Sequence, residues 1–111
     1  MQYFNWFNST LRVRGRALSL YKRGMKKANK HDHQGAIDDY SAAMDLPNAP
    51  PDEQAMAQYN RALVHLATKE DLKAINDLNY VIAMKEELTN VKTLARQKLM
   101  RIERRASSSG V

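Results

Sequence analysis

An internal repeat limits what this chain can fold into. The segment ALSLYKRGMKKANKHDHQGAIDDYSAAMDL, residues 17–46, aligns without a gap with AMAQYNRALVHLATKEDLKAINDLNYVIAM, residues 55–84. Residues of similar character recur at a constant offset of 38. The matched pairs include Tyr21 with Tyr59, Arg23 with Arg61, and Asp39 with Asp77. Such self-similarity is typical of repeat proteins, in which each unit buries its apolar face against the next unit.

The spacing of apolar residues predicts an all-α fold. Helical periodicity runs from about Ala17 to Ala106, and no segment alternates apolar and polar residues as a strand does. Three prolines between positions 47 and 51 interrupt it once. Short connections would make neighbouring helices antiparallel hairpins. The predicted helices span about 16–30, 34–46, 51–68, 71–85 and 88–105.

Small and large residues alternate at the matched positions in a way that suits close helix packing. A small residue on each helix of a hairpin lets the two backbones approach, and a large residue fills the space between successive hairpins. The predicted structural positions of the repeat are Gly24, Ala36, Tyr40, Ala62, Ala74 and Leu78.

These positions resemble those of the tetratricopeptide repeat (TPR), a helix–turn–helix unit of 34 residues with aromatic, small and alanine signature positions. The resemblance covers residues 17–84. It implies antiparallel hairpins of a right-handed superhelix, made of two repeats and a closing helix. Lys27 and His65 depart from the pattern, since an aromatic residue is usual there.

The resemblance divides the chain into three expected parts. Residues 1–15 would form an N-terminal arm or short helix, and residues 107–111 a disordered tail. Between them, residues 16–106 would form the TPR-like domain. Its repeats would lie at about 17–50 and 55–87, and its closing helix at about 88–105.

The stretch HDHQGAIDDY, residues 31–40, can be interpreted as a metal site or as a turn. In the aligned hairpins its two histidines fall in the turn, where both repeats share an acidic residue, Asp32 or Glu70, suited to capping the next helix. A metal site needs three or four converging ligands, and only His31 and His33 could converge here. We expect a capping turn and no metal site, with a weak adventitious metal contact as the alternative.

No catalytic motif is present in the sequence. The chain has no cysteine, only four glycines, no phosphate-binding loop and no Ser–His–Asp arrangement. No apolar run approaches the roughly 20 residues that span a bilayer. We therefore expect a cytoplasmic protein that is not an enzyme, has no catalytic residues and needs no cofactor.

Charge is distributed in blocks along the chain. Residues 1–30 carry eight Lys/Arg and no acid, residues 31–87 four against eleven Asp/Glu, and residues 88–111 six against one. In the TPR architecture the first helices of the hairpins line a concave groove. The resemblance therefore implies a basic groove that binds a protein or peptide partner, and we expect that partner to be acidic. The partner-binding residues it implies are Tyr21, Lys22, Met25, Asn29, Tyr59, Asn60, Leu63, Lys92 and Arg96.

Two other functions stay open at this stage. A pI near 9.7 fits an accessory protein that binds nucleic acid through its basic surface. Residues 1–16 combine aromatic side chains, such as Phe4, Trp6 and Phe7, with three arginines. This segment could cap the first hairpin, mediate homodimerisation, or contact a membrane surface.

Overall fold

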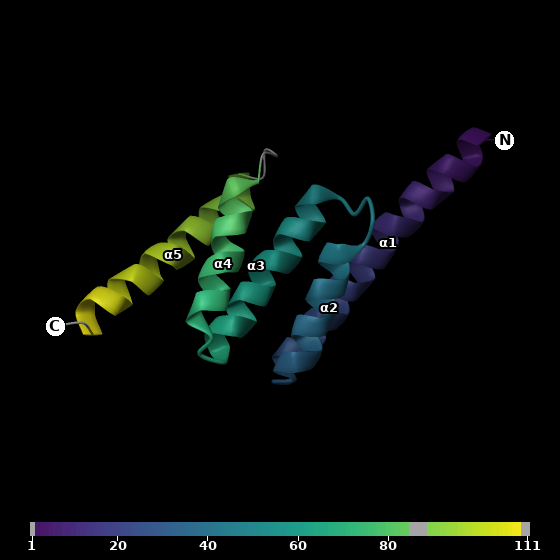
Figure 1. Ribbon diagram of the computed structural model, residues 1–111. Helices are drawn as coiled ribbons and strands as arrows, with labels where there is room; N and C mark the ends of the chain where they lie inside the picture. Colours follow the sequence, from purple (N-terminus) through teal and green to yellow (C-terminus); the bar gives the residue numbers. More distant parts are fainter. Residues whose placement is uncertain (1, 85–88, 110–111) are drawn as a thin grey trace.

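The computed structural model contains five α-helices (Figure 1). It describes the backbone of residues 2–84 and 89–109, and the side chains of residues 15–84 and 89–108. Over this part of the chain there is no strand, which confirms the all-α prediction. The helices are α1 (Gln2–Asn29), α2 (His33–Asp45), α3 (Pro51–Ala67), α4 (Asp71–Ala83) and α5 (Thr89–Ser109).

The helices form two hairpins and a closing helix. α1 packs on α2, α3 packs on α4, and α5 lies against the second hairpin (Figure 1). α3 is also in contact with α1, α2 and α5, so it occupies the middle of the molecule. The molecule is elongated, with extents of 66 × 31 × 17 Å. The start of α1 and the end of α5 lie at its opposite ends.

The helix bounds differ from the predicted ones at the two ends of the chain. α1 begins at Gln2, so the predicted arm at 1–15 is the first half of α1. That segment contains no proline that would end a helix. α5 reaches Ser109, so residues 107–109 are helical where a disordered tail was predicted. The Ser108 hydroxyl donates to the Arg104 carbonyl at 3.1 Å, which satisfies one acceptor of the last turn.

Both hairpin turns have the same backbone geometry. This geometry shows how the stretch that begins at His31 is folded. The Asp32 amide donates to the Lys27 carbonyl at 2.8 Å, and His31 has a left-handed backbone, with φ at 63°. In the second hairpin Glu70 and Lys69 repeat this geometry, with φ at 62° for Lys69. These are Schellman closures, in which a left-handed residue ends a helix. His31 therefore lies on the turn, and His33 is the first residue of α2.

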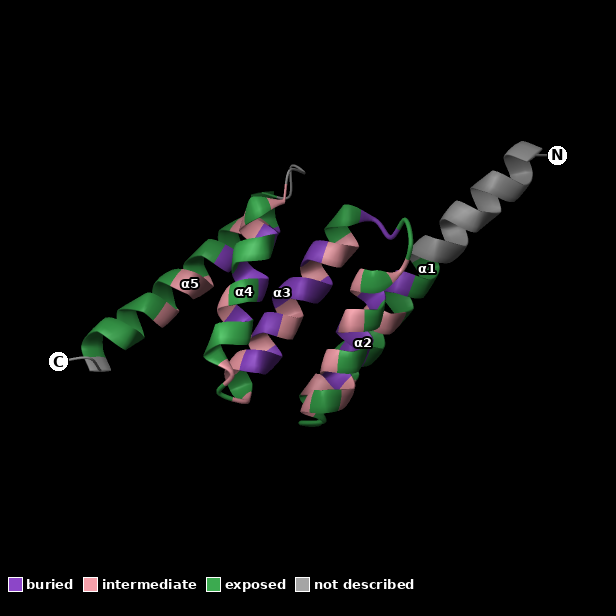
Figure 2. Cartoon of the chain, viewed as in Figure 1, coloured by how far each residue is buried: buried purple, intermediate pink, exposed green. Residues whose placement is uncertain are grey.

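Two apolar clusters form the core, one on either side of α3. The first joins α2 and α3 through buried Ala36, Tyr40, Ala43, Ala57 and Val64. The second joins α3, α4 and α5, and includes Tyr59, Leu78, Val81, Val91 and Ala95. Figure 2 shows buried positions running along the length of α3. All six predicted structural positions of the repeat are buried.

Each hairpin also encloses an arginine–aspartate pair at matched positions. Arg23 donates to both carboxylate oxygens of Asp39, each at 2.8 Å, and Arg61 donates to both oxygens of Asp77, at 2.9 and 2.7 Å. Arg61 also donates to the Ser41 hydroxyl at 2.9 Å, which connects the second hairpin to the first. Bidentate pairs of this kind fix the orientation of both side chains, so they set the register of each hairpin.

Candidate functional site: a pocket between α1 and α3

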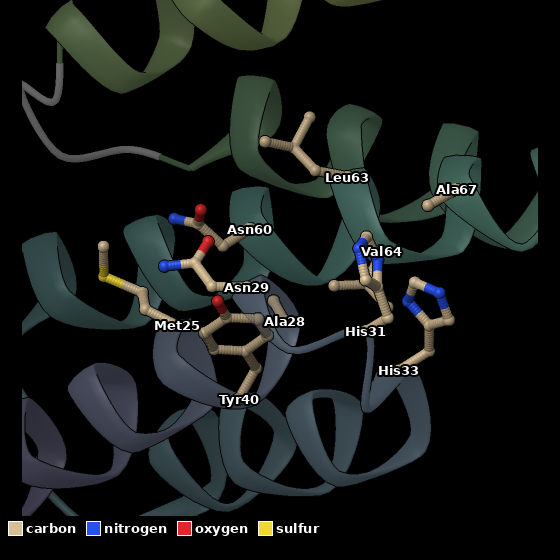
Figure 3. Close-up of a pocket in the computed structure, with 10 residues that line it drawn as sticks. All are labelled: Met25, Ala28, Asn29, His31, His33, Tyr40, Asn60, Leu63, Val64 and Ala67. Carbon is tan, nitrogen blue, oxygen red and sulfur yellow. The ribbon is translucent and has the colours of Figure 1, made fainter.

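A pocket of about 340 Å³ opens between the C-terminal halves of α1 and α3 (Figure 3). Tyr40 of α2 lies beneath it, and the turn after α1 closes one end. The residues that line it are Met25, Ala28, Asn29, His31, His33, Tyr40, Asn60, Leu63, Val64 and Ala67. We call this set the groove pocket.

The two asparagines provide the polar groups of the groove pocket. Asn60 is held in place, because its amide nitrogen donates to the Met56 carbonyl at 2.8 Å and to the Tyr21 hydroxyl at 3.2 Å. The second bond joins α3 to α1 across the groove. Asn29 is exposed and lies beside Asn60 in the close-up (Figure 3). The carbonyl oxygen of Asn60 therefore remains to accept from a peptide N–H, and the carboxamide of Asn29 can both donate and accept.

The rest of the lining is mainly apolar. Val64 is buried, Leu63 and Ala28 are half-buried, and Met25 is 40% exposed at the rim. Tyr40 is almost fully buried, and this burial raises the pKa of its hydroxyl to about 12, so the phenol stays neutral. A concave apolar surface with a few fixed polar groups is typical of a binding site for a small group or a side chain.

The structure brings together four of the nine residues predicted to bind a partner. Met25, Asn29, Asn60 and Leu63 line the groove pocket, and Tyr21 contacts it through its hydrogen bond with Asn60. The remaining four predicted residues lie elsewhere. Lys22 is exposed on another face of α1, beside Leu18, Ser19 and Lys26. Lys92 and Arg96 are on α5, half-buried and exposed respectively, and do not line the pocket.

Tyr59 is the clearest difference from the sequence-based prediction. Its side chain is only 8% exposed and belongs to the core cluster shared with α4 and α5. Its matched residue Tyr21 is half-buried and packs near Tyr40, with 6.0 Å between ring centroids. The difference arises because α5 covers the second hairpin. Tyr59 is therefore a packing residue and not part of the exposed groove surface.

The charge of the groove also differs from the expectation. No lysine or arginine lines the groove pocket. Two of the cations of α1 point toward α2, where Arg23 and Lys27 are 2.8 and 3.1 Å from the Asp39 carboxylate. The Arg23 guanidinium lowers the pKa of the Asp39 carboxyl, so this aspartate stays charged and offsets one of their two positive charges. The block of positive charge in the sequence is thus partly used inside the first hairpin.

His31 and His33 were not among the predicted binding residues, yet both line the groove pocket. Their ring centroids are 6.0 Å apart, at the end of the pocket formed by the turn (Figure 3). The repeat alignment placed His31 on the turn correctly, whereas His33 begins α2, and both residues lie at the end of the groove. One sequence signal could have identified these two residues. Neither has a matching histidine in the second repeat, so the repeat pattern alone does not explain them.

Metal binding and membrane spanning find no support in the described part of the chain. Among these residues there is no group of three or more histidine and acidic side chains close enough to hold a metal ion. None of the helices, over the same residues, combines the length and the apolar content that a membrane span requires.

Comparisons of the chain with protein-family models, with curated proteins and with solved structures gave no match. The assignment of a function therefore depends on the geometry of the groove pocket and on the internal repeat.

Proposed function

We propose that the chain is a non-catalytic interaction module, a TPR-like adaptor that binds a short peptide segment of another protein in the groove pocket. The observation that carries this proposal is the pocket itself. Apolar side chains from α1 and α3 surround two carboxamides, one of which, Asn60, is fixed by two hydrogen bonds. The resemblance to the tetratricopeptide repeat supports the same function, since its hairpins present such grooves to peptides.

The lining indicates what the peptide should contain. A volume of about 340 Å³ accommodates an apolar side chain and the adjoining backbone, in contact with Met25, Leu63 and Val64. The Asn60 carbonyl oxygen would then accept from a backbone N–H of the peptide, and the Asn29 carboxamide would donate to a backbone carbonyl. An extended segment with one bulky apolar residue fits this surface best.

A preference for an acidic peptide is the second part of the proposal. The pocket has no lysine or arginine, but the helices on either side of α3 carry exposed cations, among them Lys22, Lys26 and Arg96. These cations do not line the pocket, and charges outside a binding site mainly increase the rate of association and respond to salt. We expect acidic residues that flank the apolar residue to strengthen binding at low ionic strength.

The test is a selection from a displayed peptide library, followed by affinity measurements with a variant that fills the pocket. Ala67 is exposed at the end of α3 and lines the pocket, so Ala67→Trp should block it without disturbing the core. Ala42→Trp is the matched control, because Ala42 is exposed on α2 and aligns with Tyr80, which is also exposed. Selected peptides should bind Ala67→Trp about tenfold more weakly or worse, a loss of about 1.4 kcal/mol.

Two outcomes would contradict the proposal. One is a selection that enriches no peptide. The other is a set of peptides that bind the wild type and Ala67→Trp equally well. Nucleic-acid binding, the alternative from the basic composition, predicts instead a steep loss of affinity for oligonucleotides with salt and no effect of Ala67→Trp.

A further inference from the structure

A second cavity, of about 400 Å³, lies at the other end of α3 from the groove pocket. It is formed where α2 ends, α3 begins and α4 ends. The side chains that matter for its chemistry are Met44, Asp45, Gln54, Gln58, Tyr80 and Met84. We call this cavity the back pocket.

The polar groups of the back pocket include three acceptors. Gln54 donates to the Met44 carbonyl at 3.2 Å, and Gln58 donates to an Asp77 oxygen at 3.3 Å, so the side-chain carbonyl oxygens of both glutamines remain as acceptors. The third acceptor is the exposed carboxylate of Asp45, which forms no ion pair with any residue that the structure describes.

Exposed aromatic surface completes the back pocket. Tyr80 is 64% exposed, far more than a tyrosine in the core, and two methionines lie beside it. An aromatic face next to a carboxylate and neutral acceptors suits a guanidinium group. Arginine has five donors and no acceptor, and its planar group stacks on aromatic rings.

The part of the chain that contributes α2 and the start of α3 to the back pocket is poor in cations. Between Lys30 and Lys69 the only lysine or arginine is Arg61, and Arg61 is held by Asp77 and Ser41. Asp52, near the start of α3, is exposed like Asp45. Neither forms an ion pair with a described residue, and the described cation that interacts with Asp45 is Arg61, which already pairs with Asp77.

Two exposed arginines lie near the end of α5. Arg101 and Arg104 are exposed, and the only acid in that region of the sequence is Glu103. Neither arginine forms an ion pair with a described residue. α5 runs away from the connection between α2 and α3, and its C-terminal end lies at the far side of the molecule (Figure 1). It therefore cannot reach the back pocket of its own chain.

We propose that the back pocket binds arginine side chains from the end of α5 of a second copy of this chain. Arg101 or Arg104 of one molecule would stack on Tyr80 of the next and pair with Asp45. Such a contact joins two different surfaces, so it leads to rings or open chains of molecules. It does not depend on the groove pocket, and peptide binding there is a separate proposal.

The test is sedimentation velocity over a wide range of protein concentration, with a charge swap between the two surfaces. Asp45→Arg reverses the pocket, and Arg101→Asp with Arg104→Asp reverses the helix end. Each variant alone should associate at least tenfold more weakly than the wild type, because like charges meet. An equimolar mixture of the two variants should regain association, since each pocket again faces a helix end of opposite charge.

Salt and a neutral variant give independent measurements. Association of the wild type should be strong at about 0.05 M NaCl and weak at about 1 M, where the screening length is about 3 Å. Tyr80→Ser should also weaken association, although it reverses no charge. The altered residues are exposed, so melting temperatures should stay close to that of the wild type.

Three results would overturn the proposal. The first is a wild-type protein that stays monomeric at low salt over the whole concentration range. The second is association of the single-surface variants that equals that of the wild type. The third is a mixture of the two variants that associates no better than either variant alone.

Discussion

Gly24 lies directly against the ring of Tyr40: a methyl group at position 24 would come within 2.7 Å of Tyr40 Cε1 and 2.9 Å of Cδ1. The matched positions of the second hairpin are Ala62 and Leu78, both fully buried. Each hairpin thus places a small residue against a large one, but the sizes of the two side chains differ between the hairpins. The first pairs the smallest residue with a phenol, and the second pairs alanine with an aliphatic side chain.

This size compensation predicts a coupled pair of substitutions. Gly24→Ala should destabilise the protein, because overpacking costs about 1–3 kcal/mol and outweighs the gain of up to about 1 kcal/mol from replacing a helical glycine. Gly24→Ala combined with Tyr40→Leu reproduces the second hairpin and should recover stability. Urea unfolding of the two single variants and the double variant measures the coupling. Additive effects would show that the ring and the glycine are not in contact.

The two arginine–aspartate pairs should contribute unequally to stability. The side chains of Asp39 and Asp77 are similarly buried, but Arg23 is 61% exposed and Arg61 only 24%. Asp77→Asn leaves a charge with little access to water, and should cost about 3 kcal/mol of unfolding free energy. Asp39→Asn should cost clearly less, because water can solvate Arg23. Equal losses in denaturant unfolding would contradict this explanation.

His65 should make stability depend on pH in the mildly acidic range. Burial lowers the pKa of His65 below its usual value of 6.5, and its buried Nδ1 atom has no hydrogen-bond partner among the residues that the structure describes. Below pH 6.5 the unfolded chain binds a proton that the folded chain does not. Stability is therefore greatest above this pH and falls as the pH decreases through the folded pKa. Urea unfolding at about pH 7.5 and about pH 5 measures the effect.

A leucine at this position provides the comparison. His65→Leu should remove the loss of stability between these pH values and leave stability at pH 7.5 equal or higher, since it also removes the unpaired nitrogen. The carboxylates act in a different range: Arg23 lowers the pKa of Asp39 from 3.8, and Lys73 lowers that of Glu70 from 4.5. Their contributions disappear only at lower pH. An unchanged pH dependence in His65→Leu would exclude this assignment.

Lys69 offers a way to stabilise the fold. It has a left-handed backbone, with φ at 62°, and an exposed side chain, at the position where Schellman closures usually have glycine. Lys69→Gly should raise the unfolding free energy by about 1 kcal/mol, because glycine has no steric penalty in this conformation. Lys69→Ala is the control, since it removes the same side chain and keeps the penalty. Thermal unfolding of both should separate them, and a glycine variant no more stable than the alanine one would argue against backbone strain.

Most of the fold could be predicted from local sequence. The helices, the connection containing Pro47, Pro50 and Pro51, and the acidic cap at Asp32 follow from periodicity and turn chemistry. The Asp32 carboxylate indeed accepts from the Gly35 amide at 3.1 Å. The inner helix ends lie within two residues of their predicted places. The outer ends could not be fixed, because no proline or other strong stop signal marks them.

The candidate site was only partly predictable, because exposure depends on what covers each helix. Tyr21 and Tyr59 occupy the same place in the repeat and belong to the same kind of helix. One is half-buried and the other is in the core, since α5 covers the second hairpin. A comparison of matched residues cannot show this difference, because it treats the two repeats as equivalent.

The sequence by itself determined the repeat, the helical hairpins and the residues that pack inside them, since these depend on spacing along the chain and on residue size. Only the tertiary structure decided how charge and exposure are distributed. It turned Arg23 and Lys27 toward Asp39, and it brought His31 and His33 to the end of the groove pocket. The physical reason is that pairing and burial depend on contacts between helices, and those contacts join residues far apart in the sequence.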